Sequence, residues 1–132
     1  SSVHREVEGG GINGHSRTVD VVRIDDLVQT DSKGPRMIKI DVQGAELQVL
    51  DGAQQCLRDT DVVILETSLI GTLRDAPELS EVVAYMKEQG FVVFDMIGGL
   101  QRSLVGSLAQ GDLVFVPQSH RMRADRRWQR VV

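Results

Sequence analysis

The chain has 132 residues, of which 41% are hydrophobic and 26% are charged; this balance predicts a folded domain, or a large part of one, and excludes a disordered chain. The net charge of −4 argues against nucleic-acid binding, and no run of about 18 apolar residues offers a membrane span. We therefore expect no nucleic-acid or membrane partner.

Cysteine and aromatic content narrow the class further. Cys56 is the only cysteine, so no disulfide can form within the chain, and a reducing compartment, the cytoplasm, is expected. Its place beside Leu57 in a helical pattern favours a buried apolar side chain over a nucleophile. Because only 4% of residues are aromatic, the core must be aliphatic, which suits a parallel sheet.

Residues 1–24 are predicted to form a hairpin-like lead-in. The stretch Gly9-Gly-Gly-Ile-Asn-Gly14 satisfies the pattern G-x-G-x-x-G, but a dinucleotide-binding loop also needs a buried strand before it and a helix after it. The preceding segment is too polar for such a strand, and residues 18–24 alternate like a strand themselves. Since the Asn-Gly pair is a strong turn signal, a hairpin tip is favoured over a phosphate loop.

An α/β core is predicted over residues 25–117. Asp25 and Asp26 stand at the mouth of a short helical turn over 27–30, where a carboxylate can cap free backbone N–H groups. A polar connector then leads into an apolar strand over 36–42.

A helical stripe follows Gly44, and Gly52 interrupts it, which predicts a bend or two short helices. Residues 61–67 contain four consecutive aliphatic residues, a pattern typical of a strand buried on both faces. The stripe of this first helical segment is formed by Leu47, Leu50, Ala53 and Leu57.

The next helix begins with Asp75 and Glu78 at capping-box spacing and ends at Gly90. Its predicted buried stripe is Leu79, Val82, Val83 and Met86.

Two further strands are predicted, over 91–96 and 112–117, joined through a Gly98-Gly99 loop. Because the connection between them shows little helical periodicity, they should pair antiparallel. The order strand, helix, strand, helix, strand, strand predicts a mostly parallel sheet with helices on its faces and a terminal antiparallel strand. Residues 118–132 are arginine-rich and are interpreted as a solvated basic tail rather than a membrane or nucleic-acid patch.

Carboxylates follow two of the predicted parallel strands. In such sheets ligands bind outside the carboxyl ends of the strands, where Asp41 and Glu66 fall, with Glu46 one turn into the following helix. Three carboxylates on one rim could provide a general base for a hydroxyl, a hydrogen-bond acceptor or ligands for a hard cation. Structural roles remain open for each: Asp41 could cap the helix, Glu46 could complement its dipole, and Glu66 could bind a loop backbone. The histidines show no metal-ligand spacing, so no metal site is predicted.

The signature block of FkbM-type methyltransferases, which use S-adenosylmethionine, is similar to the stretch Ile38-Lys-Ile-Asp-Val-Gln-Gly-Ala-Glu-Leu-Gln-Val-Leu-Asp-Gly-Ala53. The segments 23–27, 62–66 and 112–116, and the helix that runs into Gly90, fit the family in order and spacing. The resemblance spans residues 19–117.

This resemblance implies a Rossmann-like methyltransferase fold, with the last strand inserted antiparallel beside its neighbours, and O-methylation of a hydroxyl on a sugar or secondary metabolite. It places Asp41 near cofactor and acceptor, gives Gly44 the tight turn beside the cofactor, and keeps Glu46 and Glu66 on the same rim. Gln43 stands where the family often has Glu.

Family members also begin with a strand and glycine-rich turn that hold the cofactor, and a further strand ends in an acidic residue that holds the ribose. Neither occurs here, so the chain resembles a single partial domain that lacks the amino-terminal, cofactor-binding half. We expect weak binding of S-adenosylmethionine to this chain alone.

The alternative to an enzyme for a small-molecule hydroxyl acceptor is a non-catalytic α/β module. Half of such a sheet would expose an edge strand, through which a homodimer could form. A carboxylate-lined metal hydrolase is a more distant third, because His and carboxylate ligand spacing is absent.

Overall fold

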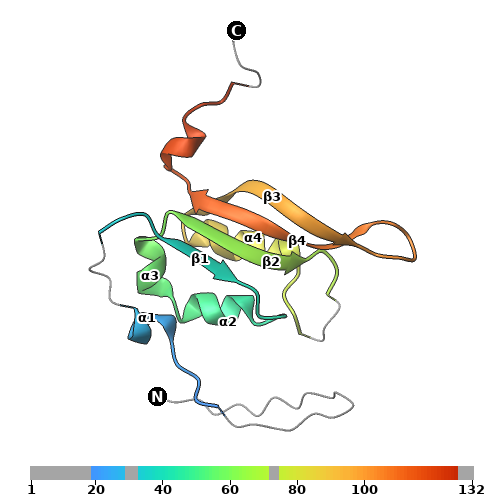
Figure 1. Cartoon of the computed structure of the whole chain (residues 1–132), viewed down its shortest axis with the longest axis horizontal. Helices are drawn as coiled ribbons and strands as arrows, with labels where there is room; N and C mark the ends of the chain where they lie inside the picture. Colours follow the sequence, from blue (N-terminus) through green and yellow to red (C-terminus); the bar gives the residue numbers. More distant parts are fainter. Residues whose placement is uncertain (1–18, 29–32, 72–74, 128–132) are drawn as a thin grey trace.

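The computed structural model describes residues 19–28, 33–71 and 75–127, and these form a layer of helices on a four-stranded sheet (Figure 1). The predicted alternation of strands and helices is confirmed, including the break at Gly52, which separates two short helices. The elements are α1 (Ile24–Leu27), β1 (Met37–Ile40), α2 (Glu46–Asp51), α3 (Gln54–Arg58), β2 (Val62–Ser68), α4 (Leu79–Glu88), β3 (Phe91–Gln101), β4 (Leu108–Pro117) and the 3-10 turn η1 (Arg121–Arg123).

The strand order is β1-β2-β4-β3, so the last strand lies between two that precede it. β1 and β2 are parallel, and β4 runs antiparallel to both of its neighbours. The predicted antiparallel pairing of the last two strands is therefore confirmed. Because β1 and β2 run in the same direction, their carboxyl ends meet at one end of the sheet (Figure 1).

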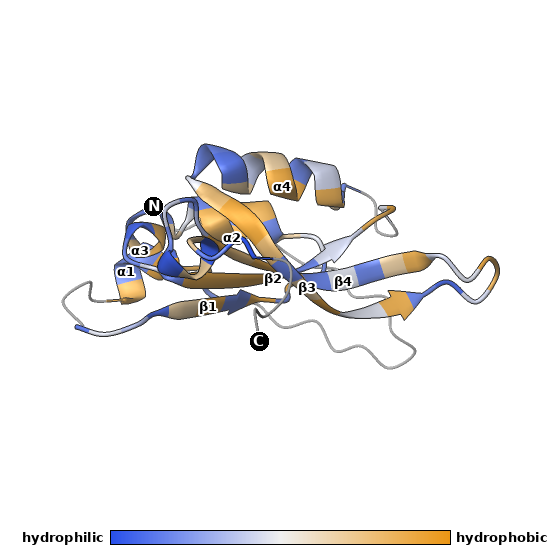
Figure 2. Ribbon diagram, turned by 90° about the horizontal axis from the view of Figure 1, so that it is seen from above, coloured by the Kyte–Doolittle hydropathy of each residue, from blue (hydrophilic) through white to orange (hydrophobic). Residues whose placement is uncertain are grey.

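The helices α2, α3 and α4 lie on one face of the sheet, not on both as the element order had predicted (Figure 2). Right-handed crossovers that advance in one direction across a sheet place their helices on the same side. The core between the layers joins Leu50, Leu57, Val82 and Met86 of the helices to Val63, Leu65, Leu113 and Phe115 of the strands.

β2 shows the difference between the two faces. Val63, Leu65 and Thr67 are buried against the helices, while the residues that alternate with them are only partly covered. The prediction of a strand buried on both faces is therefore wrong for the described part of the chain, because the helices cover one face only. In that same part, no helix is long and apolar enough to cross a membrane.

The lead-in differs from its prediction. Residues 19–23 form no strand, and Val19, Val21 and Val22 are more than half exposed. A strand needs a partner, and none of the described strands pairs with this segment. The hairpin and glycine-rich stretch predicted over 1–18 lie outside the described residues.

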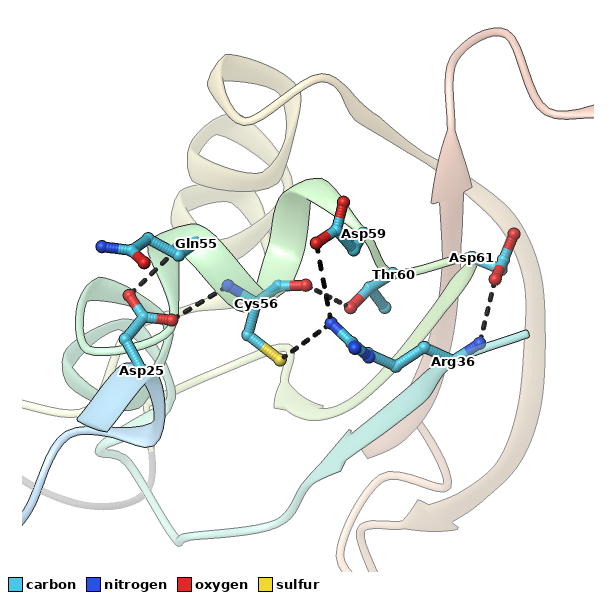
Figure 3. A network of polar contacts seen from close by, with 7 residues as sticks. All are labelled: Asp25, Arg36, Gln55, Cys56, Asp59, Thr60 and Asp61. Carbon is cyan, nitrogen blue, oxygen red and sulfur yellow. Dashed lines mark hydrogen bonds and ion pairs between the residues drawn. The ribbon is translucent and has the colours of Figure 1, made fainter. Parts of the chain in front are cut away.

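Asp25 caps a helix, but not the one in which it lies. The predicted helical turn over 27–30 begins three residues earlier, so Asp25 is inside α1. Its carboxylate accepts hydrogen bonds from the backbone N–H groups of Gln55 (3.0 Å) and Cys56 (2.9 Å) in the first turn of α3 (Figure 3). The N-cap residue of α3 is Ala53, which has no side-chain acceptor. The acceptor for the first turn of α3 is therefore Asp25, which lies in α1.

Arg36 joins the start of β1 to the link between α3 and β2 (Figure 3). Its backbone N–H donates to Asp61 Oδ2 (2.9 Å), and its guanidinium Nη1 lies 3.9 Å from both Cys56 Sγ and Asp59 Oδ2. Cys56 is buried, as predicted. This network fixes the register at which the parallel pair begins.

The predicted cap of α4 is shifted by three residues. The helix begins after Glu78, whose backbone N–H donates to Glu81 Oε2 (2.8 Å), and Asp75 adopts a positive φ in the preceding loop. Val82 and Met86 of the predicted stripe are buried, and the helix ends before Gly90 at φ +84°.

β3 and β4 are longer than predicted and form a hairpin that extends past the other strands (Figure 1). Gly98 and Gly99 are not the predicted loop but part of β3, at a register irregularity. Two glycines with positive φ allow a bulge inside a paired strand. A glycine pair is equally typical of a loop, which is what the sequence predicts at this position. The turn falls instead between Arg102 and Ser107.

Candidate active site

The turn between β1 and α2 brings the signature residues together. Asp41 directly follows β1, and the chain then reverses through Gln43 (φ +53°) and Gly44 (φ +102°). A positive φ suits glycine but is strained for glutamine, and such strain is held only where surrounding contacts fix it. The tight turn expected at Gly44 is present.

The side-chain amide of Gln43 lies between two carboxyl groups. Its Nε2 donates to Glu66 Oε2 at 3.1 Å and approaches Asp41 Oδ1 at 3.5 Å. The structure thus places Asp41 and Glu66 beside each other at the carboxyl ends of adjacent parallel strands, with one amide joining them.

Glu46 lies in the same region but faces the turn. Its side chain is buried, and Oε1 accepts the backbone N–H of Gly44 at 2.9 Å. It therefore holds the turn closed from the first position of α2, a contact more specific than the dipole role considered from the sequence. Glu46 and Glu66 still line one pocket.

The pocket is small and mostly polar. It has a volume of about 20 Å³, and its lining residues are Gln43, Gly44, Glu46, Glu66, Ser68, Ala76, Pro77 and Gln110. This volume is about that of a single water site. A more open hollow of about 280 Å³ adjoins it, because Gly44, Ala76 and Pro77 line both spaces.

β4 contributes polar residues that sequence reasoning did not identify. Gln110 Nε2 donates to Glu66 Oε1 at 2.8 Å, and Asp112 stands opposite Glu66 in the antiparallel ladder. Lys39 Nζ lies 3.7 Å from Asp41 Oδ2 and 3.9 Å from Asp112 Oδ2. The predicted strand began at residue 112, so Gln110 fell in a loop; its signal exists only in the cross-strand register.

The environment of Glu66 favours its protonated form. Partial burial is the main reason that the pKa of this carboxyl lies above its ordinary value. A hydrogen bond with Asp41 and the negative charges of Asp41 and Asp112 raise the pKa further, while Lys39 lowers it. Asp41 and Asp112 are therefore the charged neighbours that favour the protonated form of Glu66.

Such a pair can orient a hydroxyl group and accept its proton. One ionised carboxylate serves as hydrogen-bond acceptor or base, and a raised pKa brings its basicity closer to neutral pH. Among the described residues, no group of three or more His, Cys, Asp or Glu side chains could hold a metal ion. The chemistry that these side chains themselves can perform is proton transfer and hydrogen bonding.

A family model described as the methyltransferase FkbM domain matches residues 1–93. The matched stretch contains Asp41, Glu46 and Glu66, and it ends near the start of β3, before Gln110 and Asp112. No curated protein and no solved structure matches the chain.

Proposed function

Because the chain belongs to the FkbM methyltransferase family, we propose that it carries the acceptor side of an S-adenosylmethionine-dependent O-methyltransferase site. The acceptor would be a hydroxyl of a sugar or secondary metabolite. The observation that carries the proposal is the Asp41–Glu66 pair, joined by Gln43 at the carboxyl ends of two parallel strands inside the matched stretch. In open α/β sheets this is where ligands bind.

In this proposal Asp41 and Glu66 receive the acceptor hydroxyl. Asp41 is the more exposed member of the pair. Each carboxylate oxygen of Glu66 accepts a hydrogen bond from a glutamine side-chain amide. A hydroxyl that donates to this pair has its oxygen lone pair directed away from the carboxylates, and its proton can pass to them as the oxygen reacts. Glu46 acts on the geometry through the Gly44 turn.

S-adenosylmethionine supplies a methyl group on a positively charged sulfur when bound. Among the described residues, the pocket at the carboxylates holds about 20 Å³, and the hollow of about 280 Å³ beside it is open to solvent, so neither encloses a group of that size. Asp41 and Gly44, at the end of β1, are the residues that would stand nearest to it. In this proposal most of its contacts come from residues other than those described.

We propose that the complete domain has the Rossmann-like methyltransferase fold and that its cofactor-binding half joins the sheet at β1. Among the described strands, β1 pairs only with β2, so its other edge is open. Backbone groups on an open edge are ready to pair with another strand. A strand added there parallel to β1 would end near Asp41, next to the proposed acceptor site.

The charges around the site favour an uncharged acceptor. Asp41, Glu66 and Asp112 gather at its rim, and Lys39 lies between two of these carboxylates within ion-pair distance. A phosphate or carboxylate on the acceptor would face net negative charge. Neutral polyhydroxyl compounds should therefore be better acceptors than their phosphorylated forms.

The test is methyl transfer by the protein as its gene encodes it, with a panel of neutral and phosphorylated hydroxyl compounds. Glu66→Gln removes the titratable carboxyl, and Glu88→Gln, on the exposed side of α4, is its matched control. We expect transfer to neutral acceptors to fall about 100-fold or more in Glu66→Gln and to be unchanged in Glu88→Gln. Equal activity in both variants would remove Glu66 from the mechanism.

A second candidate is the non-catalytic α/β module that dimerises through the open β1 edge. The edge itself is the observation in its favour. Sedimentation of the chain separates the two: a stable dimer that has no affinity for S-adenosylmethionine would favour the module, whereas a monomer would oppose it.

A further inference from the structure

We propose that Gln110 of β4 is a positioning residue for Glu66, and that β4 thereby forms one wall of the acceptor site. The inference rests on the proposed function, because it assigns Glu66 to the acceptor hydroxyl. It goes beyond that function by adding a residue outside the stretch that the family model matches, which ends at residue 93.

The geometry is a chain of hydrogen bonds that crosses three segments. Gln110 Nε2 donates to Glu66 Oε1 at 2.8 Å, and Gln43 Nε2 donates to Glu66 Oε2 at 3.1 Å and approaches Asp41 Oδ1. Each Glu66 oxygen thus has one amide donor. Two donors on opposite oxygens fix the carboxyl plane, which a single donor would leave free to rotate.

The backbone gives Gln110 little freedom. In the β2–β4 ladder Gln110 stands opposite Ser68, and Asp112 stands opposite Glu66. Gln110 therefore reaches Glu66 diagonally, which is within the span of a long side chain on neighbouring strands. Gln110 and Ser68 both line the polar pocket, so the amide borders the space that an acceptor hydroxyl would enter.

The surroundings of Glu66 give these donors a role. Asp41 beyond β1, Asp112 on β4 and Glu46 at the start of α2 are all carboxyl groups near it, and Lys39 on β1 is the cation among the described residues that opposes them. In such surroundings the ionised form of Glu66 depends on hydrogen-bond donors, because donors to a carboxylate stabilise its charge. Of the two hydrogen bonds that Glu66 accepts from glutamine side chains, the one from Gln110 is the shorter.

The experiment uses Gln110→Met, which keeps much of the side-chain volume but removes the donor. Gln101→Met, at an exposed position of β3, is the matched control. Two readouts are measured on the protein as its gene encodes it: the pH dependence of methyl transfer, and the titration of the Glu66 carboxyl by carbon NMR in the absence of acceptor.

In Gln110→Met we expect kcat to fall about tenfold or more, with the rise of activity with pH displaced to higher pH. The NMR titration of Glu66 should move in the same direction, because the carboxylate has lost a donor. Gln110→Glu, which replaces the donor by another carboxyl, should displace both further. Gln101→Met should change neither.

The proposal is overturned if folded Gln110→Met titrates at Glu66 as the unchanged protein does. It is also overturned if kcat falls only in proportion to the loss of folded protein, with the pH profile in place, since that is the mark of a structural role. Absence of methyl transfer in the unchanged protein would refute the proposed function instead, and the NMR titration would still decide whether Gln110 positions Glu66.

Discussion

At the scale of single residues, the proposed site depends on a turn with two residues of positive φ. Gln43 and Gly44 both have positive φ, and Glu46 accepts the N–H of Gly44 from the first position of α2. The strained Gln43 is the residue whose amide joins Asp41 to Glu66. Strain at this point therefore accompanies the contact that brings the two carboxyl groups together.

Replacing Gly44 should disturb this turn. At φ +102° a side chain is strained whatever space surrounds it, so Gly44→Ala should lower the free energy of unfolding by about 1–3 kcal/mol. Chemical denaturation measures the difference. Gly71→Ala is the control, because a Cβ there meets only ordinary contacts at 3.7 Å, and its effect should be clearly smaller. Equal losses in the two variants would contradict strain at Gly44.

The raised pKa of Glu66 predicts a pH dependence of stability. A carboxyl whose pKa is higher in the folded protein stabilises the fold fully below its unfolded value of about 4.5, and this contribution is lost as the pH rises through the folded pKa. From pH 4 to about 7, the unfolding free energy of the unchanged protein should therefore fall relative to that of Glu66→Gln. Denaturation curves at several pH values test the slope; a difference that is constant with pH would show that Glu66 has no raised pKa.

The sequence located some of these residues but not others, for a physical reason. Asp41 and Glu66 could be placed because each follows an apolar run near a strand end, which is a local pattern. The roles of Gln43 and Gln110 depend on how three strands pair, and pairing register is not local. β4 begins at Leu108, ahead of the hydrophobic run 113–116 on which its prediction depended. The predicted boundary at residue 112 therefore excluded Gln110.

At the scale of elements, helix ends are held by residues distant in sequence. Asp25 in α1 accepts two N–H groups of α3, and Arg36 ahead of β1 binds Asp61 ahead of β2 (Figure 3). Sequence patterns predicted that Asp25 caps a helix, but propensity alone points to the nearest helix. The start of α4, three residues later than predicted, shifts for a local reason instead: the Glu78–Glu81 contact competes with an equally spaced pair upstream.

Removal of the Asp25 carboxylate should loosen α3. Asp25→Ala leaves two N–H groups in the first turn of α3 without their acceptor, and we expect a loss of about 1–2 kcal/mol in unfolding free energy. Asp26→Ala is a close control, because Asp26 is the exposed neighbour in the same helix. Thermal denaturation followed by circular dichroism should show a lower midpoint for Asp25→Ala alone; matching midpoints would mean that the long-range cap contributes nothing.

At the scale of the whole molecule, the sheet has one covered face and an open edge at β1 among its described strands. The order of strands and helices, and the antiparallel pairing of β3 with β4, followed from the sequence because connection lengths constrain direction. The position of β4 between β2 and β3 was implied by the family resemblance and not by connection lengths. The one-sided helix layer did not, since element order alone leaves the side of each helix open until strand order is known.

This arrangement predicts how the chain binds its proposed cofactor. Because the described residues offer about 20 Å³ at the carboxylates and only an open hollow of about 280 Å³ beside them, we expect residues 1–132 alone to bind S-adenosylmethionine more weakly than low-micromolar. Isothermal titration calorimetry on the isolated chain makes the comparison. Low-micromolar binding to a monomer would contradict the proposed site, whose cofactor contacts come mostly from a further half of the domain. Tighter binding by the protein as its gene encodes it would support the proposal.

The central claim is that Glu66, held beside Asp41, receives the hydroxyl that is methylated. Transfer of an isotopically labelled methyl group from S-adenosylmethionine to a neutral polyhydroxyl acceptor tests it most directly, when Glu66→Gln and Glu88→Gln are compared in otherwise identical protein. The account predicts transfer by the unchanged protein and by Glu88→Gln, and a loss of about 100-fold or more in Glu66→Gln with the fold intact. Undiminished transfer in Glu66→Gln would contradict it.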